Sequence, residues 1–246
     1  MERIVVWFSC GAASAVAAKK TIEKYGQTHE VLVVNNPVID EDPDNIRFLK
    51  DVEKWIGQSI NFATNVNYAS CSIEEVWEDR RYMSGIKGAP CTVELKKEAR
   101  YQWEIVNKPD WHVLGFTSDE KARFDRFVKF ERENTLPVLI DLGLTKKACI
   151  EFLISEGIDP PAMYKMGYPN ANCPGCVKAT SPTYWNHVRR VHPHIFKARA
   201  EMSRRLGVRL VRYKGKRIFL DELPEDAVGR PMKSISIECG IFCDTN

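Results

Sequence analysis

Residues 3–14 read RIVVWFSCGAAS, and this stretch decides the fold. Its first six residues are almost all apolar, which is typical of a parallel strand buried on both faces. Small residues follow, and then residues 15–25, rich in alanine and lysine, predict a helix that ends at Gly26. The stretch therefore predicts a strand, a small-residue turn and a helix.

The same alternation continues along the chain. A second apolar run at residues 30–35 predicts a strand, and Asp42 with Pro43 predicts the N-cap and first residue of a helix that runs to about Ile56. Further strands are expected at 59–63, 111–116 and 137–140, and further helices at 72–82, 92–106, 119–131 and, capped by Thr145, to 155. This order predicts an α/β fold: a Rossmann-like, doubly wound parallel sheet of about five strands.

The composition shifts toward Pro, Gly, Asn and Cys around residues 157–175. We therefore expect a nucleotide-binding α/β domain over residues 1–156. A C-terminal region over residues 157–246 follows, with basic helices, a short strand at 217–220 and an irregular tail. The two parts are expected to pack as one compact unit.

Charge is distributed unevenly over the 246 residues. The net charge is only +3, but residues 178–217 hold 12 Lys and Arg and a single acid, Glu201. This run is either a solvated surface face or an anion-binding region for nucleotide phosphates or nucleic acid. No stretch approaches the roughly 20 apolar residues that span a membrane. The N-terminus begins directly with the first strand, so we expect no secretory signal and a cytoplasmic protein.

The turn at Ser9–Ser14 follows the carboxyl end of the first strand, where α/β sheets bind ligands. Small residues let the backbone approach an anion, and the N-terminus of the next helix supplies unpaired N–H groups. The alternative is a tight turn that binds nothing.

Cysteines form the second pattern. Cys173 and Cys176 make a C-x-x-C, and Cys91 lies 82 residues before Cys173, at the expected start of a helix. Such a set binds zinc, binds an iron–sulfur cluster or acts as a redox dithiol. Tyr184 and Trp185 follow among basic residues, where they either contact a nucleotide or pack beneath the C-x-x-C.

Several motifs resemble known families. Ser9-x-Gly11-x-x-Ser14 resembles the PP-loop, S-G-G-x-D-S, of the adenine nucleotide α-hydrolase-like superfamily, with Cys10 for a glycine and Ala13 for the aspartate. The phosphoadenosine phosphosulfate (PAPS) reductase family also lacks that acid. The cysteine layout, the GFTSDEKAR segment at 115–123 and the tail ECGIFC at 238–243 are similar to that family, nearest to its phage-encoded branch. Pro90 and Phe242 depart from its pattern, which has Cys and His there.

The resemblance implies a set of site residues and a cofactor. Cys239 is the expected nucleophile, and Cys91, Cys173, Cys176 and Cys243 the expected ligands of a [4Fe-4S] cluster, with Cys239 or Cys149 as other choices for the fourth. Zinc is the alternative metal, a site without metal is a third reading, and neither flavin nor NAD is expected. The acidic loop at 40–42 lies where this fold meets the base and ribose. The expected nucleotide-binding residues are Ser9, Cys10, Gly11, Ala12, Ser14, Asn35, Asn36, Lys96, Glu120 and Arg123.

Three functional hypotheses follow. In the first, an enzyme of sulfur metabolism reduces a sulfonucleotide, PAPS or adenosine phosphosulfate (APS), through a Cys239 S-sulfo intermediate that a thioredoxin-like thiol resolves; if phage-encoded, it acts in the host cytoplasm. In the second, a PP-loop iron–sulfur sulfurtransferase uses ATP and modifies tRNA or DNA through the basic residues 178–217. In the third, the chain is a nucleotide-binding module without turnover.

Overall fold

The computed structural model describes residues 1–85 and 88–235. Cys239, Cys243 and the tail motif at 238–243 lie outside the described residues. The chain divides into two compact units that interleave along the sequence, each built from three segments. The first unit comprises Met1–Pro37, Pro43–Ala63 and Arg100–Ala162; the second comprises Val38–Asp42, Thr64–Ala99 and the chain from Met163 onward.

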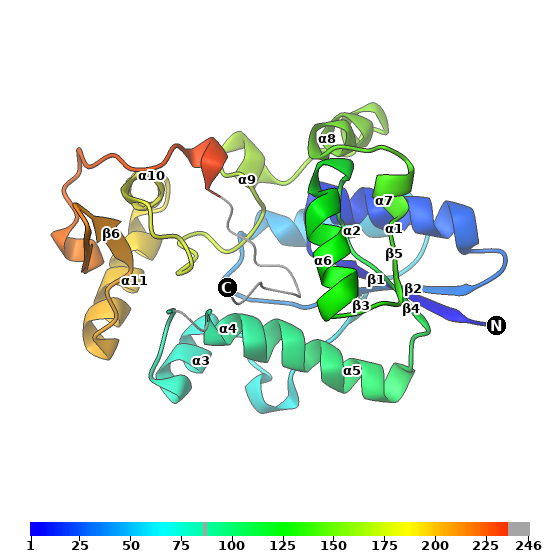
Figure 1. The fold of residues 1–246 in the computed structure, drawn as a ribbon, viewed down its shortest axis with the longest axis horizontal. Coiled ribbons are helices and arrows are strands. Elements are labelled where there is room, and N and C mark those ends of the chain that lie inside the picture. The colour runs from blue at the N-terminus through cyan, green and yellow to red at the C-terminus, as the bar shows by residue number, and fades with distance from the viewer. Residues whose placement is uncertain (86–87, 236–246) are drawn as a thin grey trace. The chain divides into compact units, whose positions relative to one another are not determined.

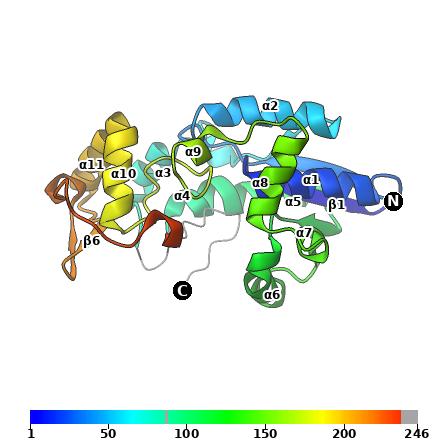
Figure 2. The ribbon, with the colours of Figure 1, turned by 90° about the horizontal axis from the view of Figure 1, so that it is seen from above.

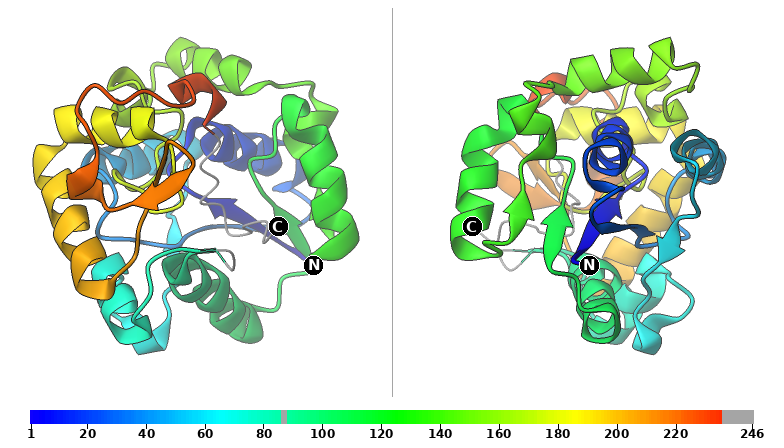
Figure 3. Two further views of the ribbon diagram at one scale, coloured as in Figure 1. Left: turned by 60° about the vertical axis from the view of Figure 1, so that its left-hand side comes forward. Right: turned by 90° about the vertical axis from the view of Figure 1, so that its right-hand side faces the viewer.

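The first unit is built on a five-stranded sheet in the order β3-β2-β1-β4-β5 (Figures 1 and 3). Every neighbouring pair is parallel. Its strands are β1 (Arg3–Phe8), β2 (Glu30–Asn35), β3 (Asn61–Phe62), β4 (Trp111–Val113) and β5 (Thr135–Leu136). The expected Rossmann-like parallel sheet is therefore confirmed, and strand order reverses between β1 and β4.

Side chains of β1 point alternately to the two faces of this sheet and pack against helices there. Phe8 packs on Phe48 of helix α2 (Asp44–Ile56), with ring centroids 6.1 Å apart. Trp7 points to the other face, where its ring meets Trp103 of α5 (Ala99–Asn107) at 5.5 Å. Helix α1 (Ala12–Tyr25) contacts β1, β2 and α2 (Figure 2). A period of two along one strand thus recruits helices to both faces.

The expected strand at 137–140 is wrong. The strand is Thr135–Leu136, and Pro137 begins the short helix α7 (Val138–Asp141), in which Asp141 N–H donates to Pro137 C=O at 2.8 Å. Proline cannot donate to a strand ladder, so pairing stops there. The remaining helical elements of this unit are η3 (Ser118–Glu120), α6 (Lys121–Phe130) and α8 (Lys146–Ser155), the last capped by Thr145 as expected.

The second unit is mostly helical around its own apolar core. Trp77, Tyr184, Trp185, Met163 and Leu210 are at most 1% exposed within it. The C-terminal region contains a hairpin of β6 (Val211–Tyr213) and β7 (Lys216–Ile218), of which only the second strand was expected. Its helical elements are η1 (Val66–Tyr68), α3 (Ile73–Arg80), α4 (Pro90–Thr92), the π-helical η2 (Val93–Glu98), α9 (Ala162–Lys165), α10 (Pro182–Val191), α11 (Pro193–Leu206), η4 (Leu220–Glu222) and η5 (Met232–Ser234).

Asp42 is not the N-cap of α2, contrary to expectation. Pro43 occupies that position with helical dihedral angles, and no side chain caps the helix there. The Asp42 carboxylate instead lies 3.7 Å from Nε2 of His192, within the second unit. Within the described residues, no helix is long and apolar enough to cross a membrane.

Candidate functional site

The turn after β1 is closed by its own polar groups. Ser14 Oγ accepts from Ser9 N–H at 3.1 Å and from Ser9 Oγ–H at 3.2 Å, and donates to Gly11 C=O at 2.9 Å. Cys10 takes a left-handed conformation, φ 53°, and Gly11 is the N-cap of α1. The two hydroxyls that the sequence offers as ligand donors therefore also hold the turn in shape.

Gly115, after β4, comes very close to this turn. A Cβ at Gly115 would lie 2.8 Å from Ser14 N and 3.1 Å from the Ala13 carbonyl carbon. Only a residue without a side chain fits at this distance. Since strand order reverses between β1 and β4, the turn and Gly115 meet at the position where open α/β sheets bind nucleotides.

Asn35 and Asn36 are buried at the end of β2. The Asn35 side-chain amide donates to Phe8 C=O at 2.8 Å and lies 3.6 Å from Cys10 Sγ. The Asn36 amide donates to Ala63 C=O at 3.0 Å. Both side chains thus fix the backbone around the turn, and their contact with a nucleotide stays a prediction.

Glu120 and Arg123 lie at the start of α6. Glu120 Oε2 accepts from Thr117 N–H and Oγ–H at 3.2 and 3.0 Å, which makes a capping box. Its other oxygen accepts from Arg123 at 2.7 Å, and the Arg123 guanidinium lies over the Phe116 ring at 5.1 Å. Arg123 therefore forms an ion pair with Glu120, and its expected contact with a nucleotide stays a prediction.

Three of the expected metal ligands line one pocket of the second unit. Cys91, Cys173 and Cys176 line a small pocket of about 20 Å³ that opens to solvent, together with Lys96 and Lys178. Cys91 lies in the first turn of α4, as expected, where backbone N–H groups favour a thiolate. The fold of this unit therefore brings Cys91 to the same pocket as Cys173 and Cys176, although 82 residues separate Cys91 from Cys173 in the sequence.

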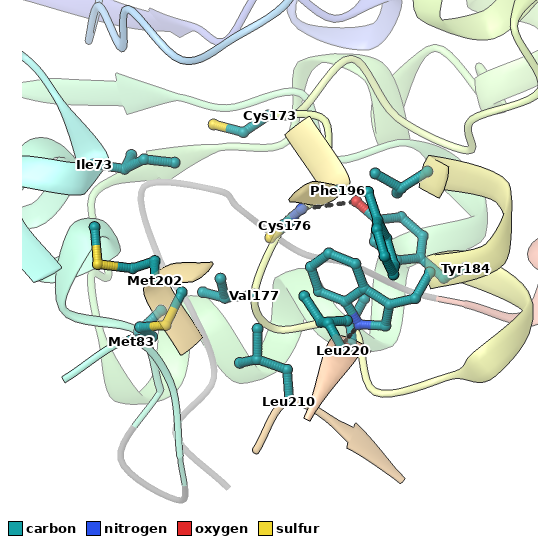
Figure 4. Packing of buried hydrophobic residues seen from close by; sticks show 14 of the residues in the cluster. Ile73, Met83, Cys173, Cys176, Val177, Tyr184, Phe196, Met202, Leu210 and Leu220 are labelled. Atoms are coloured by element: carbon teal, nitrogen blue, oxygen red, sulfur yellow. Dashed lines mark hydrogen bonds between the residues drawn. The ribbon is translucent and has the colours of Figure 1, made fainter. Parts of the chain in front are cut away.

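The C-x-x-C loop is held from beneath by aromatic residues (Figure 4). Tyr184 Oη accepts from Cys176 N–H at 2.8 Å, and Trp185 Nε1–H donates to Ala179 C=O at 2.8 Å. Gly175 has φ 68°, and a Cβ there would lie 3.0 Å from Ile195 and 3.5 Å from Trp185. Tyr184 and Trp185 therefore pack under the loop, and the loop requires glycine at 175.

The acidic loop after β2 belongs to this second unit. Asp40 pairs with Arg199 at 3.3 Å, Glu41 with Lys96 at 3.3 Å, and Asp42 with His192 at 3.7 Å. Arg199, Lys96 and His192 are each less than 10% exposed. The sequence analysis assigned this loop to the base and ribose of the nucleotide. It did not predict the pairs with Arg199, Lys96 and His192. No signal near these three acids indicates the partners, which lie at positions 96, 192 and 199.

A hydrogen-bond chain leads from this loop toward the C-x-x-C. Tyr168 Oη lies 2.9 Å from His192 Nδ1, and Tyr168, Cys173 and Cys176 line a second small pocket. Burial raises the pKa of Tyr168 above its ordinary value and lowers that of His192. Both rings are therefore favoured in their neutral forms, although the sequence patterns did not single out Tyr168.

The cysteines do not form a ready-made metal site. In the described part of the chain, no group of three or more His, Cys, Asp or Glu side chains is arranged to hold a metal ion. Cys149, a choice for the fourth ligand, lies on α8 of the first unit, where burial raises the pKa of its thiol to about 11. That pKa disfavours the thiolate that a metal needs.

The basic run at 178–217 separates into two parts. On α11, Arg199, Arg204 and Arg205 pair with acids of the second unit. Along the hairpin, five basic side chains are exposed, and none of them forms an ion pair with a described acid. These are Arg209, Arg212, Lys214, Lys216 and Arg217.

Comparisons with known proteins give a distant likeness. The sequence matches no protein-family model and no curated protein. Among solved structures, it is similar to the U34-tRNA thiolase NcsA from Methanococcus maripaludis with its [4Fe-4S] cluster, at 12% identity and a TM-score of 0.44. The match covers 84% of this chain and 72% of that chain. A likeness this distant carries no conclusion about activity.

Proposed function

We propose that the protein is an adenine nucleotide-binding enzyme of sulfur chemistry that carries an iron–sulfur cluster. The pocket lined by Cys91, Cys173 and Cys176 supports the cluster, because thiolates are the usual ligands of iron–sulfur clusters. The turn at Ser9–Ser14, at the point where strand order reverses, supports the nucleotide site.

The donor set fits such a cluster in kind. Three thiols line one pocket, and Cys243, or Cys239 in its place, is expected to supply a fourth from outside the described residues. The side chains do not stand in a metal-ligand arrangement, so loading requires the cysteine side chains to turn toward a common centre. When bound, the cluster would supply positive iron centres for sulfur or sulfate chemistry.

Iron analysis tests this proposal. The protein is purified without oxygen, and iron, acid-labile sulfide and zinc are measured with the absorption and paramagnetic resonance spectra. Cys91→Ser, Cys173→Ser and Cys176→Ser should each lower the iron content at least tenfold. Cys71→Ser is the matched control, because Cys71 is buried in the same unit but does not line the pocket. Stoichiometric zinc in place of iron would contradict the proposal.

Sulfur transfer to nucleic acid is the reaction that the described residues support better. The five exposed basic side chains of the hairpin offer an anionic polymer a binding surface, which a small sulfonucleotide does not need. Ala13 stands where ATP-cleaving relatives of the PP-loop carry aspartate, so ATP cleavage is measured directly. The assay contains ATP, nucleic acid and inorganic sulfide as the sulfur donor. Adenylation of a base oxygen would release pyrophosphate, and sulfide would then displace AMP, so pyrophosphate and a thiolated nucleoside by mass spectrometry are the expected products.

Sulfonucleotide reduction is the second candidate, favoured by the ECGIFC tail and by Lys178 beside the cysteine pocket. The Cys239 thiolate would attack the sulfur of PAPS or APS, the S–O bond to the adenylate phosphate would break, and 3′,5′-ADP or AMP would leave with the bonding electrons. A thioredoxin-like thiol would then attack Cys239 Sγ, form a disulfide with it and release sulfite.

An intact-mass measurement separates the two candidates. Protein with its metal is mixed with PAPS or APS in the absence of reductant, and peptides are mapped. A sulfonate adduct on Cys239 that disappears in Cys239→Ser, with nucleotide binding retained, establishes reduction. Absence of an adduct in metal-loaded protein, together with a thiolated nucleoside, establishes sulfur transfer.

A further inference from the structure

The β6–β7 hairpin is a short antiparallel ribbon with a tight turn. Val211 pairs with Ile218, Arg212 with Arg217, and Tyr213 with Lys216. Lys214 and Gly215, the two turn residues, have φ of 46° and 77°. Two positive φ values in a two-residue loop match the turns whose twist fits a hairpin. The local backbone is therefore well defined.

The base of this ribbon, where β6 begins and the chain leaves β7, is anchored in the core. Leu210, Val211 and Leu220 are at most 1% exposed, and Arg212 N–H donates to Thr180 C=O at 2.9 Å. The basic side chains consequently extend from a fixed base. A preorganised charged surface loses less conformational freedom when it binds a partner.

The exposed side chains of the hairpin carry positive charge that no acid of the hairpin balances. Arg212 and Arg217 lie directly opposite each other, and like charges in such a cross-strand pair destabilise a hairpin. The charge of Arg212, after the larger effect of burial, contributes to lowering the pKa of Arg217. In contrast, Arg204 on α11 has both Asp221 and Glu222 at 2.8 Å. An external anion would relieve the repulsion that the chain itself leaves in the hairpin.

The side chains of the hairpin suit phosphates better than bases. From residue 208 to 219 the sequence is VRLVRYKGKRIF, which contains no Asn, Gln, Ser, Thr, Asp or Glu. The amides that read adenine and the carboxylates that read cytosine are therefore missing, whereas Arg and Lys contact phosphates of any sequence, and guanine is the base that Arg also reads. The expected binding is strongly dependent on salt, and any base preference is for guanine.

We propose that the exposed basic side chains of this hairpin, Arg209, Arg212, Lys214, Lys216 and Arg217, bind the phosphodiester backbone of nucleic acid. Its role as the surface that recruits the substrate rests on the proposed sulfur transfer, but the binding itself does not. For duplex DNA, every phosphate that the protein ceases to neutralise lowers the slope of log K against log salt by about 0.9. Removing four charges should lower that slope by about 3.6 and weaken binding at least tenfold at moderate salt.

Fluorescence anisotropy of labelled duplex DNA and of a labelled stem-loop RNA measures the binding affinity and its dependence on salt. The test variant is Arg212→Gln/Lys214→Gln/Lys216→Gln/Arg217→Gln in the full chain. The control, Arg190→Gln/Lys197→Gln/Arg204→Gln/Arg205→Gln, removes the same charge from helices α10 and α11. Circular dichroism confirms that both are folded, and anionic phosphatidylserine vesicles are the competing probe.

The expected result is that the hairpin variant loses binding while the control keeps most of it, and the tighter of DNA and RNA names the natural polymer. Equal losses in both variants, or binding to vesicles without binding to either nucleic acid, overturns the proposal. The outcome for function is separate. If binding depends on the hairpin but no nucleoside is thiolated, the binding surface is supported and sulfur transfer is rejected. If nucleosides are thiolated and the hairpin variant binds as tightly as the unchanged protein, only the binding surface is rejected.

Discussion

The turn at Ser9–Ser14 and the pocket around Cys91, Cys173 and Cys176 are assembled in opposite ways. The turn is made by six consecutive residues whose hydroxyls and carbonyls bond to one another, with Gly115 as a close neighbour. The pocket draws its cysteines from segments 82 residues apart, and Lys96, which also lines it, is paired with Glu41 from a third segment.

This difference bears on how each site responds to mutation. A turn closed by local hydrogen bonds needs little from the rest of the chain, so its shape can be read from its sequence. A pocket made of distant segments depends on the buried pairs that hold those segments in place. We therefore expect long-range effects on stability in the second unit and local effects on binding in the first.

Removing the Asp40 carboxylate should have the largest effect. Asp40 accepts from Ile73 N–H at 2.9 Å and pairs with Arg199, which is 3% exposed. Asp40→Ala leaves a buried guanidinium with fewer partners, and breaking a buried pair costs about 3 kcal/mol. The free energy of unfolding from urea titration checks this value. Asp221→Ala, in the exposed pair with Arg204, should cost less than about 1 kcal/mol, and equal losses would contradict the contrast.

A methyl group at Gly115 should disturb the first unit next. The added Cβ would lie 2.8 Å from Ser14 N, against backbone that cannot rotate away. Overpacking of this kind costs about 2 kcal/mol, and the displaced turn should bind ATP or a sulfonucleotide more weakly in calorimetry. Gly157→Ala is the comparison, since its φ of 74° makes it strained while no atom lies within 4 Å of its new Cβ. Unchanged nucleotide binding in Gly115→Ala would place the nucleotide elsewhere.

The sequence predicted the locally determined parts of the molecule. Strands β1 and β2 occur with the expected bounds, because continuous apolar runs of four or five residues bounded by polar residues have few alternatives. Pro137–Ile140 went wrong because a short apolar run buries itself equally well as one turn of helix. The pairs of the acidic loop could not be predicted, since nothing local to Asp40 or Asp42 indicates Arg199 or His192. The tail that carries Cys239 lies outside the described residues, so its role stays a prediction.

The pH dependence of stability distinguishes the two units further. His112 on β4 is 1% exposed, and burial, followed by the charges of Arg132 and Arg100, lowers its pKa from 6.5 to about 3. Below pH 6.5 the unfolded chain takes up a proton that the folded chain does not. Stability from this group is therefore complete above pH 6.5 and falls by about 1.4 kcal/mol per pH unit as the pH decreases toward 3.

His112→Gln should flatten that slope between pH 6 and 4, measured by urea unfolding at each pH. His29→Gln, which changes a partly exposed imidazole of the same unit, is the comparison variant. A slope that persists in His112→Gln would assign the pH dependence to other groups, among them His192 of the second unit, whose pKa burial also lowers.

The smallest effect on stability, and the sharpest on binding, is expected from Ser14→Ala. The change removes the acceptor for Ser9 N–H and Ser9 Oγ–H and the donor to Gly11 C=O, three neutral hydrogen bonds that contribute about 0.5 kcal/mol each at the low end of the usual range. Because these bonds shape the turn that we propose binds the nucleotide, nucleotide affinity should fall about tenfold, or about 1.4 kcal/mol. Iron content should stay constant, since the cysteine pocket takes no residue from this turn.

Cys173→Ser should give the reverse result, with iron lost and nucleotide binding retained. If each variant instead loses both properties, the two sites depend on each other, and the distinction between a locally closed turn and an assembled pocket fails.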